Sequence, residues 1–359
     1  MRLSVRVTPR RAAAVLAGAI ALGLLVAWSG VISIGASSGH WRITSWALHW
    51  AMQNSTRTYA LFEPAPPDDI DSAANIRRAA GHFETGCAFC HGSPLNPAPG
   101  LSAHMTPMPP GLQGSPATWT PRELARIVRH GVKYTGMPAW IAPQRDDEIW
   151  AMVAFLRALP ALSPQDYRRL AGLTPSTAPA SEDRVLAGCA RCHGVDGGSD
   201  GGAFPVLGGQ TEAYLQASLA DFASGTRPSG IMQLAVDGLS AQDLARMARH
   251  YAAQRGLQQE PPAPTGGLGG RIARQGLPEA DVPACESCHG ASPRHNSAYP
   301  RLTGQDATHL RTQLQLFRDG RRGVTGQARI MQRIAERLPP EAVAAIAEFY
   351  SGVGGKPPR

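Results

Sequence analysis

The sequence predicts an all-α protein in which an N-terminal apolar helix precedes three domains of similar size. A short pattern occurs three times along the 359 residues, as CAFCHG at 87–92, CARCHG at 189–194 and CESCHG at 285–290. Amphipathic helical patterns follow each copy, and no stretch alternates apolar and polar residues with the period of two expected of a strand. A chain of this length corresponds to two or three domains.

Composition and charge narrow the possible functions. The 39 glycines and 31 prolines indicate that much of the chain forms loops and turns. The formal net charge is +8, and 33 of the 35 basic residues are arginine. A nucleic-acid interface usually concentrates such charge on a basic helix or a patch interleaved with aromatic residues. No such patch stands out, so we expect no nucleic-acid partner.

The N-terminal segment has the features of a membrane anchor. Residues 12–39 carry no charged side chain and follow Arg2, Arg6, Arg10 and Arg11. A spanning helix needs roughly 20 apolar residues, whereas the apolar core of a secretory signal has only about 7–15. We therefore expect a transmembrane helix, with a signal cleaved near GAS at 35–37 as the alternative. The preceding arginines place the N-terminus in the cytoplasm and the remainder in the periplasm, outside the bacterial inner membrane.

Three tryptophans follow the apolar run. Trp41, Trp46 and Trp50 lie where the chain would leave the bilayer, which is typical of an interfacial helix with an aromatic belt. The alternative is that this helix packs against the first soluble domain, and the two interpretations are compatible.

The spacing of the motifs predicts the domain organisation. Their first cysteines are 102 and 96 residues apart, which indicates successive domains rather than a solenoid. Segments rich in proline or glycine at 63–69, 173–183 and 260–270 are the expected linkers. We therefore expect a cytoplasmic tip, anchor and interfacial helix in residues 1–62, and domains at 63–172, 173–262 and 263–359.

The similarity between the units extends beyond the cysteines. Each motif is followed by the pattern P-x-L-x-G, then by a helix that begins at Thr120, Thr211 or Asp306 as its N-cap and ends near glycine. Amphipathic helices starting at 146, 240 and 339 close the units. Each closing helix carries aromatic residues on its apolar side.

Three chemistries compete for a C-x-x-C-H pattern. A zinc site would combine pairs of cysteines, but these pairs lie about 100 residues apart and each has its own histidine. A thioredoxin-like pair would need a βαβ setting, and no strand pattern is present. Covalent haem attachment uses two thiols for the two vinyl groups and the adjacent imidazole for the iron. The sequence therefore predicts three covalently bound haem c groups, attached through Cys87, Cys90, Cys189, Cys192, Cys285 and Cys288.

On these motifs the chain resembles class I c-type cytochromes. The second and third units resemble the two halves of the cytochrome c4 family, through GCARCHG…FPVLGGQ…SGTR…IM and ACESCHG…YPRLTGQ…DGRR…IM. The first unit resembles another class I branch, through TGCAFCHG…GVKYTGMPAW, and its lead-in is similar to membrane-anchored respiratory cytochromes. The resemblance implies that the carbonyls of Pro110, Pro205 and Pro300 accept a hydrogen bond from the iron-bound histidine. A simple turn at each proline is the alternative.

Each unit offers a methionine as the sixth iron ligand. Met137, Met232 and Met331 lie between the middle and closing helices, where class I cytochromes place their methionine loop. Methionine is more often core filler than ligand, and Met105 and Met108 are rivals in the first unit. We expect Met152 and Met247 to be core residues. The expected iron ligands are His91, Met137, His193, Met232, His289 and Met331.

The remaining histidines of the soluble domains follow no metal-ligand spacing. We expect these to be surface groups or neighbours of the haem sites: His82, His104, His130, His250, His295 and His309.

These features predict an electron-transfer protein rather than an enzyme, since methionine ligation closes the iron to substrates. The resemblance implies respiratory partners: a quinol-oxidising complex or a soluble cytochrome as donor, and a terminal haem-copper oxidase as acceptor. Residues 182–260 carry −3 and residues 261–359 carry +5, so different units would steer different partners. The alternatives are the cytochrome subunit of a periplasmic quinoprotein dehydrogenase of the alcohol type and a peroxidase-like enzyme with one open iron.

Overall fold

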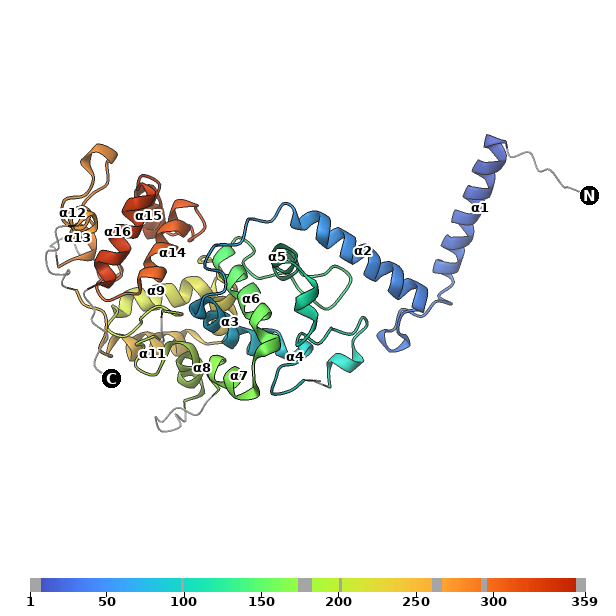
Figure 1. Ribbon diagram of the computed structural model, residues 1–359, viewed down its shortest axis with the longest axis horizontal. Coiled ribbons are helices and arrows are strands. Elements are labelled where there is room, and N and C mark those ends of the chain that lie inside the picture. The colour runs from blue at the N-terminus through green and yellow to red at the C-terminus, as the bar shows by residue number, and fades with distance from the viewer. Residues whose placement is uncertain are drawn as a thin grey trace, which may run out of the picture.

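The computed structural model describes residues 8–97, 100–173, 183–199, 202–259, 267–291 and 296–352. Within these ranges the regular structure is helical, with three isolated β-bridges and no strand, which confirms the all-α prediction. The chain runs from a separate N-terminal helix through one unit to a pair of units (Figure 1). Arg2, Arg6 and most of the second and third expected linkers lie outside the described residues.

The apolar N-terminal helix is shorter than the uncharged run that predicted it. Helix α1, Pro9–Trp28, has a mean hydropathy of 1.9 and is exposed along its length. It ends well before residue 39, because the Ser29 hydroxyl bonds the Val26 carbonyl at 2.7 Å and Gly30 turns the backbone to φ 69°. By length and composition α1 suits a membrane span, as a signal sequence also would.

Helix α2, Arg42–Ala60, has two different ends. Its C-terminal part packs against α5, Pro121–His130, and buries Thr56 and Ala60. Its N-terminal part leaves Trp41, Trp46 and Trp50 exposed, and the last two rings stack with centroids 6.4 Å apart. The packing on the first unit is confirmed for the C-terminal turns, and the interfacial role of the exposed tryptophans stays a prediction.

The first unit is built around a pair of packed helices, α3 and α6. Phe83 on α3, Phe155 on α6 and Tyr167 on α7 are fully buried, and their ring centroids lie 5.0–6.4 Å apart. These rings occupy the centre of the largest core of the molecule. The helices of this unit are α3 Ala73–Gly86, α4 Ala88–His91, α5 Pro121–His130, α6 Asp146–Ala158 and α7 Pro164–Leu170.

The second and third units repeat one arrangement. Thr120, Thr211 and Asp306 act as N-caps of the middle helices in the three units, as their positions predicted. Two short helices, α10 and α15, were not anticipated, and they carry Met232 and Met331. The helices are α8 Arg184–His193, α9 Glu212–Ala223, α10 Gly230–Val236, α11 Ala241–Ala252, α12 Leu268–Gln275, α13 Glu286–His289, α14 Ala307–Arg318, α15 Gly326–Ala335 and α16 Pro340–Ser351.

The second and third units contact each other through two equivalent glutamines. Gln210 accepts from the Arg301 backbone N–H at 2.8 Å and donates to the Arg301 carbonyl at 3.2 Å. Gln305 makes the corresponding pair of bonds to Val206, at 2.9 and 3.0 Å. Each glutamine directly follows its P-x-L-x-G pattern, so the repeated sequence produces a reciprocal contact between units.

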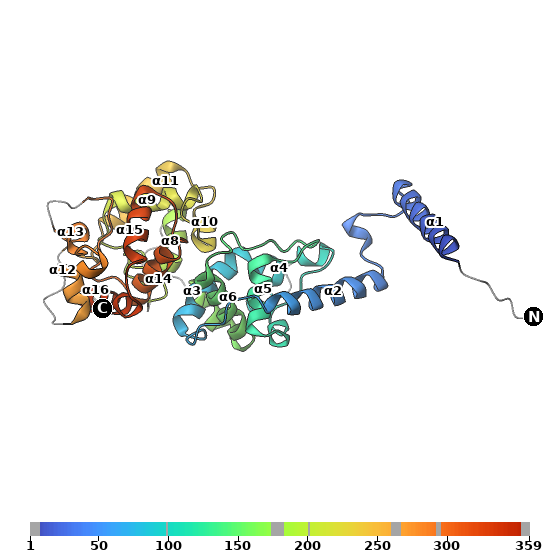
Figure 2. The same ribbon diagram turned by 90° about the horizontal axis from the view of Figure 1, so that it is seen from above.

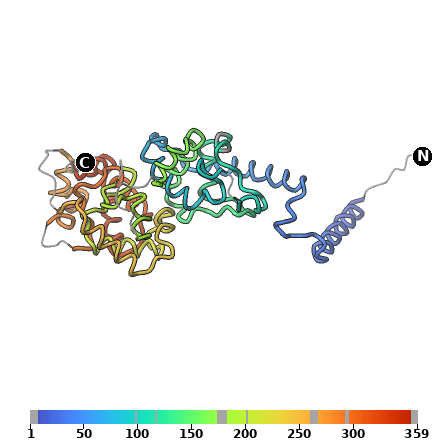
Figure 3. The backbone as a smooth tube through the Cα atoms, turned by 90° about the horizontal axis from the view of Figure 1, so that it is seen from below, coloured from blue at the N-terminus to red at the C-terminus, as the bar shows by residue number. Residues whose placement is uncertain are grey.

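The first unit lies between α2 and this pair of units (Figures 2 and 3). Its helix α3 packs on α8 of the second unit, where the Arg77 side chain donates to the Arg191 carbonyl at 3.1 Å. A Cβ added to Gly81 would lie 3.2 Å from the sulfur of Cys192. The backbone of the first unit therefore reaches the second C-x-x-C-H motif.

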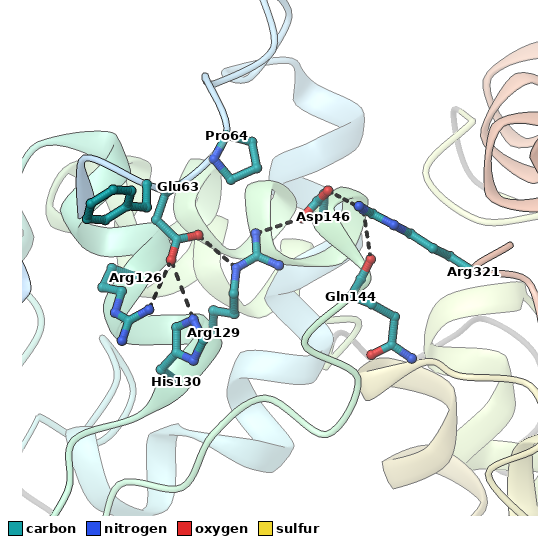
Figure 4. Close-up of a pocket in the computed structure, with 9 residues that line it drawn as sticks. Glu63, Pro64, Arg126, Arg129, His130, Gln144, Asp146 and Arg321 are labelled. Carbon is teal, nitrogen blue, oxygen red and sulfur yellow. Dashed lines mark hydrogen bonds and ion pairs between the residues drawn. The ribbon is translucent and has the colours of Figure 1, made fainter. Parts of the chain in front are cut away.

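The segment 63–69, expected to be a linker, begins with a buried ion pair. Glu63 accepts from Arg129 at 2.8 Å, and Arg129 also contacts Asp146 at 2.7 Å. Asp146 in turn pairs with Arg321 of the third unit at 2.5 Å (Figure 4). These groups border a pocket of about 280 Å³. The chain of charges joins the end of α2 to the first and third units, so this segment is not a free tether.

We expect Phe155→Ala to destabilise the first unit by about 3–5 kcal/mol, because truncating a fully buried ring leaves a cavity. Denaturant unfolding followed by circular dichroism measures the change. Phe62→Ala is the matched control, since that ring is 80% exposed. Equal unfolding free energies for the two variants would contradict the assignment of this core.

Candidate haem-binding sites

Each C-x-x-C-H motif places its histidine against a proline carbonyl. The Nδ1 atoms of His91, His193 and His289 lie 2.9, 3.4 and 2.9 Å from the carbonyl oxygens of Pro110, Pro205 and Pro300. These are the contacts that the resemblance implied. An imidazole that donates from Nδ1 presents Nε2 with its lone pair outward, which is the tautomer that an iron ligand needs.

Burial disfavours the thiolate and raises the pKa at four of the motif cysteines, Cys87, Cys189, Cys192 and Cys285. Burial raises the pKa of Cys87 to about 12 and that of Cys285 to about 12. Zinc ligands and redox-active pairs require the thiolate, which basic surroundings normally stabilise. Covalent haem attachment instead ends in thioethers, which carry no charge and suit apolar surroundings. The donor set therefore fits haem better than zinc.

The three expected methionines all lie between the middle and closing helices of their units along the chain. Met137 is in a loop, where its backbone N–H bonds the Thr135 hydroxyl at 3.1 Å. Met232 and Met331 lie on α10 and α15. All three side chains are half-buried. Their ligation to iron stays a prediction.

Met105 lies closer to the first motif than its place in the sequence suggested. Its sulfur is 3.8 Å from the sulfur of Cys90, and its methyl group would meet a Cβ added to Gly136 at 2.5 Å. It is therefore adjacent to the segment that carries Met137, and it stays a rival ligand. Met152 and Met247 are buried within their closing helices, as predicted for core residues.

Two arginines, Arg227, which is buried, and Arg322, which is half-buried, suit the carboxylate groups of haem. Arg227 and Arg322 share the Gln313 side chain between the second and third units. Although burial favours the neutral phenol, these two guanidinium groups lower the pKa of Tyr214 to about 8. Among the described residues neither forms an ion pair with a carboxylate. Since guanidinium prefers planar carboxylates, these residues fit the propionates of haem, and they belong to the matching SGTR and DGRR segments.

The other histidines have separate partners. The His82 ring packs against Trp140 in a tilted arrangement with ring centroids 4.7 Å apart, and burial lowers the pKa of His82 to about 4. The His250 imidazole contacts the Val195 carbonyl at 2.7 Å, and His130 lies 3.5 Å from Glu63. Among the described residues no three His, Cys, Asp or Glu side chains are grouped as metal ligands. His295 lies outside the described residues.

Sequence reasoning missed the arginine pair Arg227 and Arg322, and it also missed a buried carboxylate of the first unit. Glu148, in the first turn of α6, is 3% exposed and accepts hydrogen bonds from the second unit. Acidic residues at a helix start are ordinarily explained by the helix dipole, and Glu148 follows Asp146 and Asp147. No feature of the sequence separates it from these two neighbours.

Comparisons with known proteins identify the fold of two units. Residues 74–156 match the family described as cytochrome c oxidase, cbb3-type, subunit III, and residues 183–260 match the family cytochrome c. Cytochrome c4 of Azotobacter vinelandii is 34% identical over 176 residues, which are 46% of this chain and 84% of that protein. The chain belongs to the cytochrome c4 family. Cytochrome c4 of Pseudomonas aeruginosa is 35% identical over 51% of this chain and 93% of its own.

The chain is also similar to proteins that are named as electron acceptors of an enzyme. The thiosulfate dehydrogenase electron acceptor of Stutzerimonas stutzeri is 34% identical over 47% of this chain and 80% of that protein. Membership of the c4 family makes the chain an electron-transfer cytochrome with covalently bound haem c. These three matches each cover about half of the chain.

We expect three covalent haems per chain, and a ferric spectrum with three methionine–iron ligations, because each motif has its own histidine and methionine. Pyridine haemochrome analysis gives the count, and the methionine–iron charge-transfer band gives the ligation. Met137→Ala should remove the low-spin state from one haem, whereas Met105→Ala should leave all three haems low-spin. A count of two haems, or conversion by Met105→Ala alone, would contradict the assignment.

Proposed function

We propose that this protein is a membrane-anchored triheme c-type cytochrome that transfers electrons in a bacterial respiratory chain toward a terminal haem-copper oxidase. The observation that carries the proposal is the threefold occurrence of one arrangement, a C-x-x-C-H turn whose histidine bonds a proline carbonyl. The proposed domain limits are 63–172, 173–262 and 263–359. The haem c groups, when bound, supply one-electron chemistry.

The residues of the chain have distinct proposed roles. The six motif cysteines attach the haems, and the proline carbonyls orient His91, His193 and His289 toward the iron. Met137, Met232 and Met331 complete the ligation and exclude substrates from the metal, which favours electron transfer over catalysis. Arg227 and Arg322 provide the cationic surroundings for propionates between the second and third units.

Two observations support an oxidase as the acceptor. The first unit matches a family described as a cbb3-type oxidase subunit over residues 74–156. The region of the third unit carries +5, and the second carries −3. A basic unit would bind an acidic docking surface, and this attraction weakens as salt screens it. An anchor in the inner membrane, with the haem units in the periplasm, would raise the frequency of encounter with membrane complexes.

A second candidate is the electron acceptor of a periplasmic dehydrogenase, including a quinoprotein alcohol dehydrogenase. The similarity to thiosulfate dehydrogenase electron acceptors favours it, because those relatives are named as acceptors of electrons from a dehydrogenase. The two candidates differ in the process that stops when the protein is removed.

Oxygen uptake by membranes from a deletion strain separates the candidates. Transfer to an oxidase predicts slower uptake with every respiratory donor that feeds that oxidase, since the shared carrier is missing. Restoration by the full-length protein is the control. Loss of respiration with a single dehydrogenase substrate, and unchanged uptake with all others, would support the second candidate and contradict the first.

We expect the protein to remain with membranes through high salt and alkaline washing, because the exposed apolar surface of α1 would be buried in lipid. Immunoblotting of washed membranes measures retention. A variant with α1 deleted behind a cleavable signal provides the soluble comparison. Recovery of the native protein in the soluble fraction, beginning near residue 38, would show that the segment is a signal.

A further inference from the structure

The carboxylate of Glu148 lies between the methionine segments of two different units. On one side are Ser229 and Gly230, directly before Met232 in the second unit. On the other is Trp140, which follows Met137 by three residues in the first unit. Glu148 itself belongs to α6, whose residues make the central core of the first unit. The carboxylate is therefore fixed by a rigid helix.

Four donors contact this carboxylate, two on each oxygen. Oε1 accepts from the Ser229 hydroxyl at 2.5 Å and from the Arg145 guanidinium at 3.1 Å. Oε2 accepts from the Gly230 backbone N–H at 2.6 Å and from the indole of Trp140 at 3.1 Å. A buried carboxylate with four donors has strong directional contacts on both oxygens.

The contact extends directly to the backbone that carries Met232. The Ser229 hydroxyl that donates to Glu148 also accepts from the Met232 backbone N–H at 3.0 Å, as the N-cap of α10. Arg145 donates to the Pro228 carbonyl at 2.7 Å. A Cβ on Gly230 would come within 2.2 Å of the Trp140 indole nitrogen, so only glycine allows this approach. The turn before Met232 is thus inserted into the first unit.

We propose that Glu148 is a positioning residue shared by two haem sites, which fixes the segments that carry Met137 and Met232 and so couples the iron ligation of the first and second units. This inference rests on the proposed function, since it takes both methionines as iron ligands. The third unit has its methionine on α15, to which Glu148 makes no contact among the described residues, so its haem lies outside this coupling.

The proposal predicts a pattern across the three haems. Methionine ligation raises the potential of haem iron, so a loosened methionine segment lowers it. Glu148→Ala should weaken the methionine–iron band and lower the reduction potential of the first and second haems. The band and the potential of the third haem should not change. Trp140→Phe removes the indole donor and should affect the first haem alone. Ser229→Ala removes the hydroxyl and should affect the second alone.

Redox titration of the full-length holoprotein, followed by visible and near-infrared spectra, measures both quantities. Met137→Ala, Met232→Ala and Met331→Ala assign each signal to its haem. Glu148→Gln keeps an accepting oxygen and should give smaller changes than Glu148→Ala. Glu84→Ala is the matched control, because that carboxylate bonds Tyr167 at 2.5 Å within the first unit and contacts neither methionine segment.

The outcomes separate this inference from the proposed function. If Met232→Ala leaves the methionine–iron band intact, the ligand assignment itself is wrong. If the methionine variants behave as ligands, but Glu148→Ala leaves all three potentials unchanged in a folded protein with three haems, the coupling is refuted. Equal shifts of all three haems, or equal effects of Glu84→Ala, would also refute it, because a general loss of packing would then be the cause.

Discussion

The hydrogen bond between a motif histidine and a proline carbonyl is the constraint around which each unit is arranged. It fixes the imidazole that follows the two cysteines, and it ties the short C-x-x-C-H turn to the segment that leads into the middle helix. The N-capped middle helix and the methionine segment then follow along the chain. A single local requirement, repeated three times, thus accounts for most of the similarity between units whose remaining sequences differ.

The contacts between the units are of two kinds. The second and third units meet through Gln210 and Gln305, two equivalent residues that bond the backbone of the opposite unit, so the repeat itself produces the interface. The first unit instead uses charged side chains, among them Arg77, Arg145 and Glu148, that bond groups of the second unit. Because most of these donors and acceptors are buried and satisfied, each would leave an unpaired polar group if the units separated. The three units therefore form one connected structure.

The sequence predicted those parts of the fold that follow from local chemistry. Thr120, Thr211 and Asp306 were recognised as N-caps because a cap depends on its own residue type and the turn that follows. The motif histidines followed from a repeated spacing, whereas the role of their prolines was implied by the resemblance to class I c-type cytochromes. Helices α10 and α15 were missed because seven to ten residues give too little periodicity to identify. Glu148 and the Arg227–Arg322 pair were missed because their function depends on residues of another unit, and no spacing within one unit records that.

The ion pairs at Glu63 have a consequence for the distance at which the protein works. Helix α2 has 19 residues and so measures roughly 28 Å at 1.5 Å per residue. Glu63, just after its C-terminal end, pairs with Arg129 of α5. Arg129 also pairs with Asp146, which in turn pairs with Arg321 of the third unit. With α1 in a bilayer, α2 becomes a spacer of set length, and the first unit stays at a limited height above the lipid. A membrane-bound partner must then expose its redox centre at a matching height, whereas a freely diffusing one need not.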